Sequence, residues 1–265
     1  MHRASLTAIA DEEGTDKGTV SPVGLAITGH NYTDVYDAYL NGLRDRPIAL
    51  LEIGLGVSGP AWKAELATGR NAQGGASMRM WYRYLSKARI FGIDVNPAGF
   101  LDNDRTATAV VDQGDPDRLR EFVAETGVER FDVIIDDGSH RPDHQQVSFS
   151  VLFPHLAPGG LYFIEDLADN GLGDGRVDRY SADHVVNTRR LLRAFSEGGE
   201  FPEPNALLEP ATLASAIDSI SFYCPPVSGE RPRGLRALLG RRPPTVRFLG
   251  GQEALCVIRK AAEAG

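Results

Sequence analysis

Two short apolar runs in this chain end abruptly at acidic residues, and this pattern constrains the fold more than any other feature. Residues 131–140 read Phe-Asp-Val-Ile-Ile-Asp-Asp-Gly-Ser-His, and residues 159–166 read Gly-Gly-Leu-Tyr-Phe-Ile-Glu-Asp. Apolar runs of this length, bounded by glycine and charge, are typical of buried parallel strands. Because ligands of open α/β sheets bind at the carboxyl ends of the strands, we expect a single functional rim. It would carry Asp136, Asp137, His140, Glu165 and Asp166.

Other strand-like and helix-like segments alternate along the chain. Strands are predicted over residues 48–53, 89–93, 106–111, 131–136, 159–165, 220–224 and 254–258. Helices are predicted over residues 33–43, 77–85, 115–126, 143–156 and 184–196. The predicted fold is therefore α/β: a doubly wound, mostly parallel, seven-stranded Rossmann-like sheet with a helical N-terminal segment and a lid insertion.

The length of 265 residues and a hydrophobic content of 42% favour one domain with an ample core. We expect four parts: a helical N-terminal segment (1–45), a core that carries the ligand sites (46–167), a lid and acceptor region (168–200) and C-terminal strands (201–265). Residues 168–180 are rich in glycine and aspartate, and a loop of this length in a compact domain is usually a lid or binding loop.

Charge and hydropathy argue against two classes of partner. The net charge of −8 gives little support for a nucleic-acid groove. The N-terminus lacks the apolar core of a signal peptide, and no apolar stretch approaches membrane-spanning length. A cytoplasmic protein that binds neither nucleic acid nor membrane is the expectation.

The acidic residues of the rim suggest a metal site. Several carboxylates that converge on a cleft repel one another unless a cation lies between them. His140, three residues after Asp137, would be well placed as a base. The competing interpretation is structural, because strand-end acids often cap the next helix and Asp-Gly-Ser is ordinary turn chemistry.

The first three predicted strands end in residues that suit an adenosine-containing cofactor. Glu52-Ile-Gly-Leu-Gly forms a glycine-rich bend, where the backbone can come close to a ligand. Asp94 could accept both ribose hydroxyls, and Asp112, with Gln113 beside it, could meet the adenine amine. The full set of candidate cofactor residues is Glu52, Gly54, Gly56, Ser77, Asp94, Asp112, Gln113 and Asp136.

Among adenosine cofactors, S-adenosylmethionine fits best. A nicotinamide site would place its acid about 20 residues after the glycines, whereas 42 residues separate Glu52 from Asp94. No Gly-Lys-Ser/Thr phosphate-binding motif occurs in the chain. An acid directly before the glycines also suits a cationic cofactor better than a pyrophosphate.

Taken together, these motifs resemble the class I S-adenosylmethionine-dependent methyltransferases. More narrowly, they resemble the metal-dependent sugar O-methyltransferases of antibiotic biosynthesis, of the mycinamicin- and calicheamicin-pathway type. The resemblance covers roughly residues 12–167. It rests on Gly14-Thr-Asp-Lys-Gly, His30-Asn-Tyr-Thr, Leu51-Glu-Ile-Gly-Leu-Gly, Gly74-Gly-Ala-Ser-Met-Arg-Met-Trp, Phe91-Gly-Ile-Asp, Asp136-Asp-Gly-Ser-His and Ile164-Glu-Asp-Leu.

The resemblance implies specific roles for the rim. Mg²⁺ would be held by Asp137, Glu165 and Asp166, and His140 would be the general base. The acceptor would be a small molecule that contains a sugar, either a nucleotide-deoxysugar or a glycosylated natural product, and the enzyme would be a homo-oligomer. The roles of four N-terminal residues stay open. Lys17 and Asp16 could fix the N-terminal segment or contact the cofactor, and His30 and Tyr32 could reach the acceptor or a neighbouring subunit.

Two other functions remain open. An oxidoreductase that uses NAD or a nucleotide-sugar would share the sheet and the ribose carboxylate, but it would not need three acids around a metal. A non-catalytic adenosine-binding module would explain the cofactor pocket without explaining His140.

Overall fold

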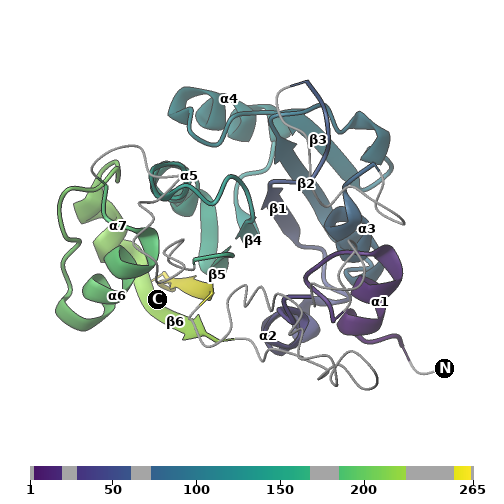
Figure 1. Ribbon diagram of the computed structural model, residues 1–265, viewed down its shortest axis with the longest axis horizontal. Helices are drawn as coiled ribbons and strands as arrows, with labels where there is room; N and C mark the ends of the chain where they lie inside the picture. The colour runs from purple at the N-terminus through teal and green to yellow at the C-terminus, as the bar shows by residue number, and fades with distance from the viewer. Residues whose placement is uncertain (1–2, 20–28, 61–72, 168–184, 225–253, 264–265) are drawn as a thin grey trace, which may run out of the picture.

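The computed structural model describes residues 3–19, 29–60, 73–167, 185–224 and 254–263. Its centre is a seven-stranded sheet in the order β3-β2-β1-β4-β5-β7-β6 (Figure 1). Strands β1 to β5 run parallel to one another, and β7 is antiparallel to both β5 and β6. The strands are β1 (Ala49–Ile53), β2 (Arg89–Asp94), β3 (Thr106–Val110), β4 (Phe131–Asp136), β5 (Leu156–Ile164), β6 (Ile217–Tyr223) and β7 (Leu255–Lys260).

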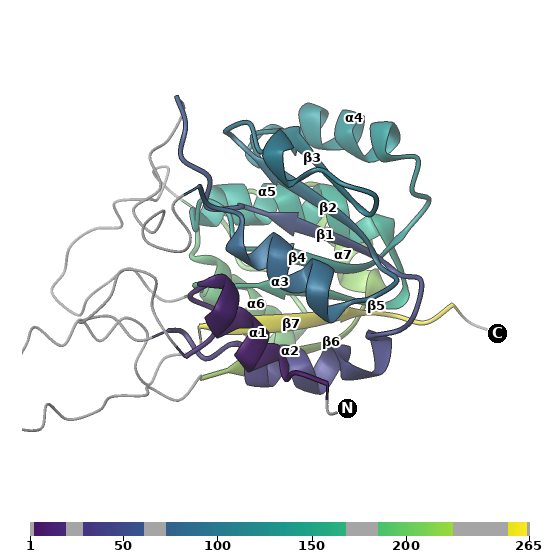
Figure 2. The ribbon, with the colours of Figure 1, turned by 90° about the vertical axis from the view of Figure 1, so that its right-hand side faces the viewer.

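Helices cover both faces of this sheet. They are α1 (Leu6–Glu13), α2 (Thr33–Leu40), α3 (Ala76–Tyr84), α4 (Pro116–Thr126), α5 (Pro142–Leu152), α6 (Thr188–Gly198) and α7 (Pro210–Ala216). Figures 1 and 2 show α1, α2 and α3 on one side and α4 to α7 on the other. The predicted doubly wound α/β fold is therefore confirmed.

The two faces of the sheet follow from strand geometry, since successive side chains of a strand point to opposite sides. Leu50 of β1 belongs to a buried cluster with the residues of α1, α2 and α3. Its neighbour Leu51 belongs to a second buried cluster, with residues of α4 to α7. Because both faces are covered, the central strands read as continuous apolar runs in the sequence.

Several predicted elements have different bounds in the structure. The helix predicted over 143–156 ends at Leu152, and the 3₁₀ turn Phe153–His155 leads directly into β5. Pro154 explains the early end, because proline has no N–H with which to continue the helical hydrogen bonds. Helices α1 and α7 were not predicted. The expected lid loop, residues 168–180, lies outside the described residues.

The register of the sheet brings three strand ends together. Ile53 of β1 pairs with Asp136 of β4, which in turn pairs with Ile164 of β5. Two further backbone hydrogen bonds continue this register past the strand ends: Asp137 N–H donates to the Ile53 carbonyl and Glu165 N–H to the Asp136 carbonyl, both at 2.9 Å. The residues that follow β1, β4 and β5 consequently lie side by side on one rim.

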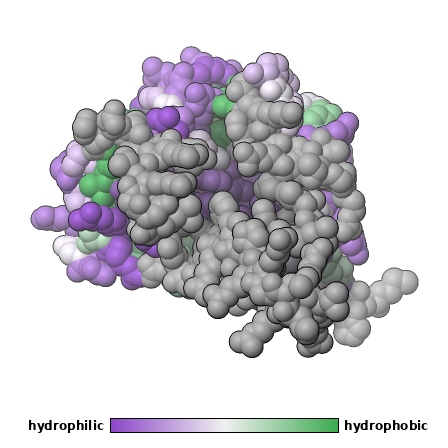
Figure 3. Space-filling model, in the orientation of Figure 1, coloured by the Kyte–Doolittle hydropathy of each residue, from purple (hydrophilic) through white to green (hydrophobic). Residues whose placement is uncertain are grey.

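Among the described residues, no helix combines the length and the apolar character needed to cross a bilayer. The described part of the face in Figure 3 is mainly hydrophilic, with small hydrophobic patches.

Candidate active site

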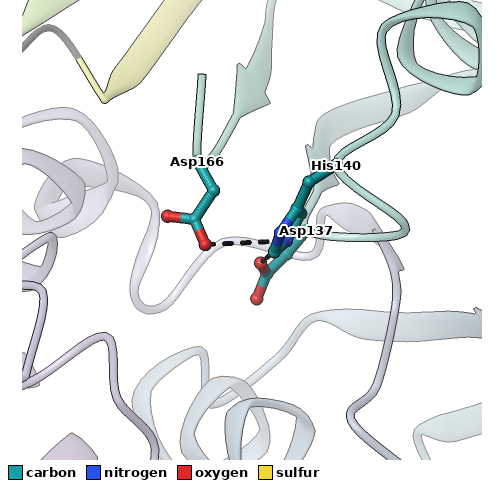
Figure 4. Close-up of side chains that lie close together, drawn as sticks. All are labelled: Asp137, His140 and Asp166. Carbon is teal, nitrogen blue, oxygen red and sulfur yellow. Dashed lines mark hydrogen bonds and ion pairs between the residues drawn. The ribbon is translucent and has the colours of Figure 1, made fainter. Parts of the chain in front are cut away.

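Three polar side chains converge where β4 and β5 end: Asp137, His140 and Asp166 (Figure 4). His140 Nε2 lies 3.2 Å from Asp137 Oδ1 and 3.6 Å from Asp166 Oδ2. One potential ligand atom from each residue falls within 4.8 Å of the others. All three side chains are partly exposed, so a ligand has access to them. We refer to these three residues as the rim cluster.

The backbone of the rim cluster is strained. His140 and Asp166 adopt left-handed conformations, with φ of +58° and +52°. For a residue other than glycine this conformation costs about 1–3 kcal/mol, and such residues gather at functional sites. The strain therefore agrees with a chemical role for the two side chains that it orients.

The N-terminal segment supports Asp166. The Tyr32 hydroxyl donates a 2.6 Å hydrogen bond to Asp166 Oδ1, and His30 Nδ1 lies 3.7 Å from the same oxygen. Burial lowers the pKa of His30, but the charges of Asp166 and Asp16 outweigh this effect and raise it. The His30-Asn-Tyr-Thr motif thus contacts the rim cluster directly.

A buried lysine lies behind the rim cluster. Lys17, fully excluded from solvent, forms a short ion pair with Asp137 Oδ2 and a 2.8 Å hydrogen bond to Glu165 Oε1. Its ammonium is also 3.6 Å from Glu52 Oε1. Glu165 faces this interior, where its Oε1 also accepts a short hydrogen bond from the Tyr36 hydroxyl. Asp137 therefore joins the buried lysine to the exposed rim cluster.

The charges of this arrangement shift several pKa values. Burial raises the pKa of Asp137, but the Lys17 ammonium and His140 outweigh it and lower that pKa to about 2. Burial lowers the pKa of His140, yet Asp166 and Asp137 raise it to about 9. In the absence of other ligands, Asp137 is thus a stable anion beside an imidazolium.

The donor set of the rim cluster suits a hard divalent cation. Asp137 and Asp166 offer carboxylate oxygens, the ligands that Mg²⁺ prefers. Glu165, which the family resemblance implies as a third ligand, follows β5 directly but points toward Lys17 and Tyr36. Asp137 and Asp166 are therefore the carboxylates best placed to hold the metal together with water and an acceptor hydroxyl.

The candidate cofactor residues continue the same rim toward β1 and β2. Glu52 is fully buried, and its Oε2 accepts a 2.8 Å hydrogen bond from Ser77 Oγ. Among the described residues its Oε1 has no hydrogen-bond partner. Burial, opposed by Lys17, raises the pKa of Glu52 to about 7. A buried acceptor with free capacity fits the cationic end of S-adenosylmethionine.

Asp94 is the last residue of β2 and Asp112 lies two residues after β3, and the two carboxylates have different surroundings. Asp94 is nearly buried and accepts backbone hydrogen bonds from Leu55 at 2.9 Å and Asn96 at 2.8 Å. It thereby clamps the glycine turn to the end of β2. The Asp112 side chain is 59% exposed and accepts from the Gly114 N–H. Both carboxylates retain acceptor sites for a nucleoside.

Gln113 and Asp136 contact each other. Gln113 Nε2 donates to Asp136 Oδ1 at 3.1 Å, and its Oε1 accepts from the Ser139 N–H at 2.6 Å. Asp136 also accepts a 2.7 Å hydrogen bond from Ser148 of α5. Burial is the main reason that the pKa of Asp136 rises to about 6. In this structure the pair braces the turn that carries Asp137 and His140.

The two glycines after β1 serve different purposes. A Cβ on Gly54, whose φ is +81°, would lie 2.1 Å from the Asp137 carbonyl oxygen. At Gly56, whose φ is +60°, a Cβ would meet none of the described atoms within 4 Å. Gly54 is thus required by the packing of two backbone turns, and Gly56 leaves open space that a cofactor could fill.

Alanine at these two positions should therefore affect different properties, mainly the stability of the fold at Gly54 and mainly ligand binding at Gly56. Gly54→Ala should destabilise the fold by at least about 3 kcal/mol, combining left-handed strain of about 1–2 kcal/mol with overpacking. Gly56→Ala should cost only the strain but weaken binding of S-adenosylhomocysteine. Thermal unfolding and calorimetric titration measure the two effects. Equal destabilisation by both variants would contradict the assignment.

The contacts of Lys17, Tyr32 and Tyr36 with the strand-end acids were not predicted from the sequence. Lys17 and Tyr32 belong to the Gly14–Gly18 and His30–Thr33 motifs, but nothing in the sequence placed them against residues more than 100 positions away. His144, four residues after His140, contacts Ser139 at 3.1 Å and faces Asp112.

Comparison with known proteins finds similarity to several O-methyltransferases. Demethylmacrocin O-methyltransferase of Streptomyces fradiae is 40% identical over 139 residues, 52% of this chain and 32% of that protein. The 8-demethyl-8-alpha-L-rhamnosyl tetracenomycin-C 2'-O-methyltransferase of Streptomyces olivaceus is 36% identical over 162 residues, 61% of this chain and 37% of that protein. The chain thus spans about a third of the length of these curated relatives. No protein-family model matches it.

Among solved structures, the MycE methyltransferase from the mycinamycin biosynthetic pathway, in complex with Mg and SAH, has the same fold. It matches with a TM-score of 0.65 and 23% identity, covering 100% of this chain and 57% of MycE. This likeness establishes the architecture. At the level of sequence, the chain is similar over more than half of its length to demethylmacrocin O-methyltransferase and to the rhamnosyl tetracenomycin-C 2'-O-methyltransferase.

Proposed function

We propose that this chain transfers a methyl group from S-adenosylmethionine to a sugar hydroxyl, with Mg²⁺ bound at the rim cluster. The observation that carries the proposal is the convergence of Asp137, His140 and Asp166 beside the glycine turn after β1. A metal site next to a nucleoside pocket is what this reaction requires. Sequence identity of 36–40% to sugar O-methyltransferases supports the same conclusion.

The chemistry depends on making a sugar hydroxyl nucleophilic. Mg²⁺ supplies a Lewis acid that lowers the pKa of a bound hydroxyl, and S-adenosylmethionine supplies the methyl group. Asp137 and Asp166 would hold the metal, with Glu165 as a further candidate ligand. With a divalent cation bound to these carboxylates, the pKa of His140 would be lower and its neutral form favoured. Neutral His140 would receive the hydroxyl proton on Nε2, the atom that faces both carboxylates. Their negative charge stabilises the imidazolium that forms.

On the cofactor side, the residues bind and orient. We propose that Glu52, Gly54, Gly56, Ser77, Asp94, Asp112, Gln113 and Asp136 form or brace the S-adenosylmethionine pocket. Correct alignment of the methyl group with the attacking oxygen is a major source of acceleration in such reactions. The bonds from Leu55 and Asn96 to Asp94 hold the glycine turn in a fixed position for that purpose.

The ribose contact can be tested through Asp94. Replacement by Asn keeps the size of the side chain but removes its charge, so affinity for S-adenosylhomocysteine should fall by about 1.5–3 kcal/mol, the worth of a hydrogen bond to a charged group. Calorimetric titration measures this loss. The matched variant Asp102→Asn, on the loop before β3, should bind as wild type does. An unchanged dissociation constant in Asp94→Asn would refute the contact.

Cofactor identity separates the proposal from an oxidoreductase. Titration of the purified protein with S-adenosylhomocysteine and, separately, with NAD should give binding only for the first. Binding of NAD alone would favour the oxidoreductase. Cofactor binding without methyl transfer to any acceptor would favour a non-catalytic module.

We propose that the methyl acceptor is a small molecule that contains a sugar. The names of the relatives give three test compounds: demethylmacrocin, mycinamicin VI and 8-demethyl-8-alpha-L-rhamnosyl tetracenomycin C. We call these the acceptor panel. A nucleotide-deoxysugar is the other candidate substrate, and residues 168–200 are the proposed acceptor region. We further propose that the enzyme acts in the cytoplasm as a homo-oligomer, which light scattering on the purified protein would test.

A further inference from the structure

Within the Gly14–Gly18 motif, Lys17 is the charged residue whose side chain reaches the interior of the rim. It has no role in the proton and methyl transfers proposed for this site. Its ammonium contacts one carboxylate from each of three strand ends: Glu52 near the end of β1, Asp137 directly after β4 and Glu165 directly after β5. The lysine is 0% exposed. It thus lies between the proposed cofactor acid and the proposed metal acids.

The backbone around Lys17 is fixed as firmly as its side chain. The Lys17 carbonyl accepts a 3.1 Å hydrogen bond from the N–H of Thr33, the first residue of α2. On either side, the Asp16 and Gly18 carbonyls accept from the N–H groups of His30 and Asn31 at 2.6 and 3.0 Å. The segment that carries Lys17 is therefore anchored to the same motif that contacts Asp166.

The two oxygens of Asp137 have separate partners. Oδ2 pairs with Lys17, and Oδ1 faces His140 in the rim cluster. An ammonium held at a fixed point behind the carboxylate determines which oxygen is presented outward. The same ammonium hydrogen-bonds Glu165, the other acid that the family resemblance implies as a ligand.

We propose that Lys17 is a positioning residue, which orients the carboxylate of Asp137 for the metal and holds Glu165 and the cofactor acid Glu52 behind it. This inference rests on the proposed function, because it assumes that the rim cluster binds a divalent cation. Hydrogen-bond partners behind metal ligands are general determinants of affinity, and their loss typically weakens binding by about 10–100-fold.

When Lys17 is removed, the direction in which the metal affinity changes distinguishes an orienting role of Lys17 from a purely electrostatic one. Lys17 carries a positive charge a few ångströms from the site, so by Coulomb's law its removal should strengthen the binding of a divalent cation. If its main effect is to orient ligands, its removal should weaken that binding instead. Glu52 provides a control of opposite charge. Its Oε1 lies 3.6 Å from the Lys17 ammonium, which is an ion-pair distance but too long for a hydrogen bond.

The experiment is calorimetric titration of the full chain with Mn²⁺, a spectroscopically visible substitute for Mg²⁺. Lys17→Met should raise the Mn²⁺ dissociation constant at least about tenfold, within the range for lost partners of metal ligands. Glu52→Gln should change it by less than about threefold, since no orienting bond to a ligand is lost. Equal or tighter Mn²⁺ binding by folded Lys17→Met would overturn the inference. If Lys17→Met does not fold, Glu52→Gln decides: near wild-type affinity supports positioning, and a tenfold loss overturns it.

A third variant separates this inference from the proposed function. Asp137→Asn should abolish Mn²⁺ binding if the rim cluster is the metal site. Unchanged affinity in that variant would refute the metal part of the proposed function itself. Loss of binding in Asp137→Asn together with wild-type affinity in Lys17→Met would refute only the role of Lys17. Circular dichroism of each variant checks that the fold is intact.

Discussion

Replacement of Asp137 by Asn is expected to reduce turnover on the acceptor panel by at least about a thousandfold, equal to about 4 kcal/mol of activation free energy. Asp137 is the residue through which the buried lysine, the base and the second carboxylate are connected. The amide of Asn keeps an oxygen for Lys17 and nearly the same volume, so the fold should survive. Binding of S-adenosylhomocysteine should change less than about threefold, because no proposed direct cofactor contact is lost.

Asp132 offers a matched control on the same strand. It lies at the opposite end of β4, where its carboxylate accepts a 2.9 Å hydrogen bond from the Ala49 N–H. Asp132→Asn retains that acceptor and should leave the rate of methyl transfer unchanged. Full activity of Asp137→Asn, or an equal loss in both variants, would contradict a metal-binding role for Asp137.

Replacement of His140 by Ala is expected to lower kcat by roughly 10²–10⁴-fold, the contribution of one well-placed general base. Affinities for metal and cofactor should stay near those of wild type, since the carboxylates and the glycine turn remain. Steady-state kinetics on the acceptor panel, with separate Mn²⁺ and S-adenosylhomocysteine titrations, tests this combination. A general base affects kcat, whereas a pure binding group affects KM.

His155 is the control for this variant. It belongs to the 3₁₀ turn Phe153–His155 before β5, at the end of that strand opposite to Asp166. His155→Ala should have wild-type kinetics. If His140→Ala raised only KM, His140 would be a binding group, and the base would have to be sought at His144 or in a metal-bound hydroxide.

The rim of the sheet could be predicted because its determinants are local. A short apolar run followed by carboxylates identifies a buried strand and the point where it ends, and both β4 and β5 satisfy this pattern. The acids at the ends of β2 and β3 could be placed for the same reason. The helix after β4 is shorter than predicted because Pro154 ends it before Pro158 and the glycines that follow are reached.

The interior of the site could not be predicted because its contacts are distant in sequence. Lys17 and Asp137 are 120 residues apart, and Tyr32 and Asp166 are 134 apart. No periodicity joins such pairs. Successive side chains at a strand end also point in opposite directions. Glu165 consequently faces Lys17 while Asp166 faces His140, a separation that two adjacent acids in a sequence do not reveal.

The most direct test of the proposed function is the metal dependence of methyl transfer. Labelled S-adenosylmethionine, the purified chain and the acceptor panel are incubated with Mg²⁺, with excess EDTA, and with EDTA followed by excess Mg²⁺. Methylation of a sugar hydroxyl is expected with Mg²⁺, together with its loss in EDTA and its recovery when Mg²⁺ is restored. Full methylation in EDTA would contradict metal-dependent methyl transfer by this chain.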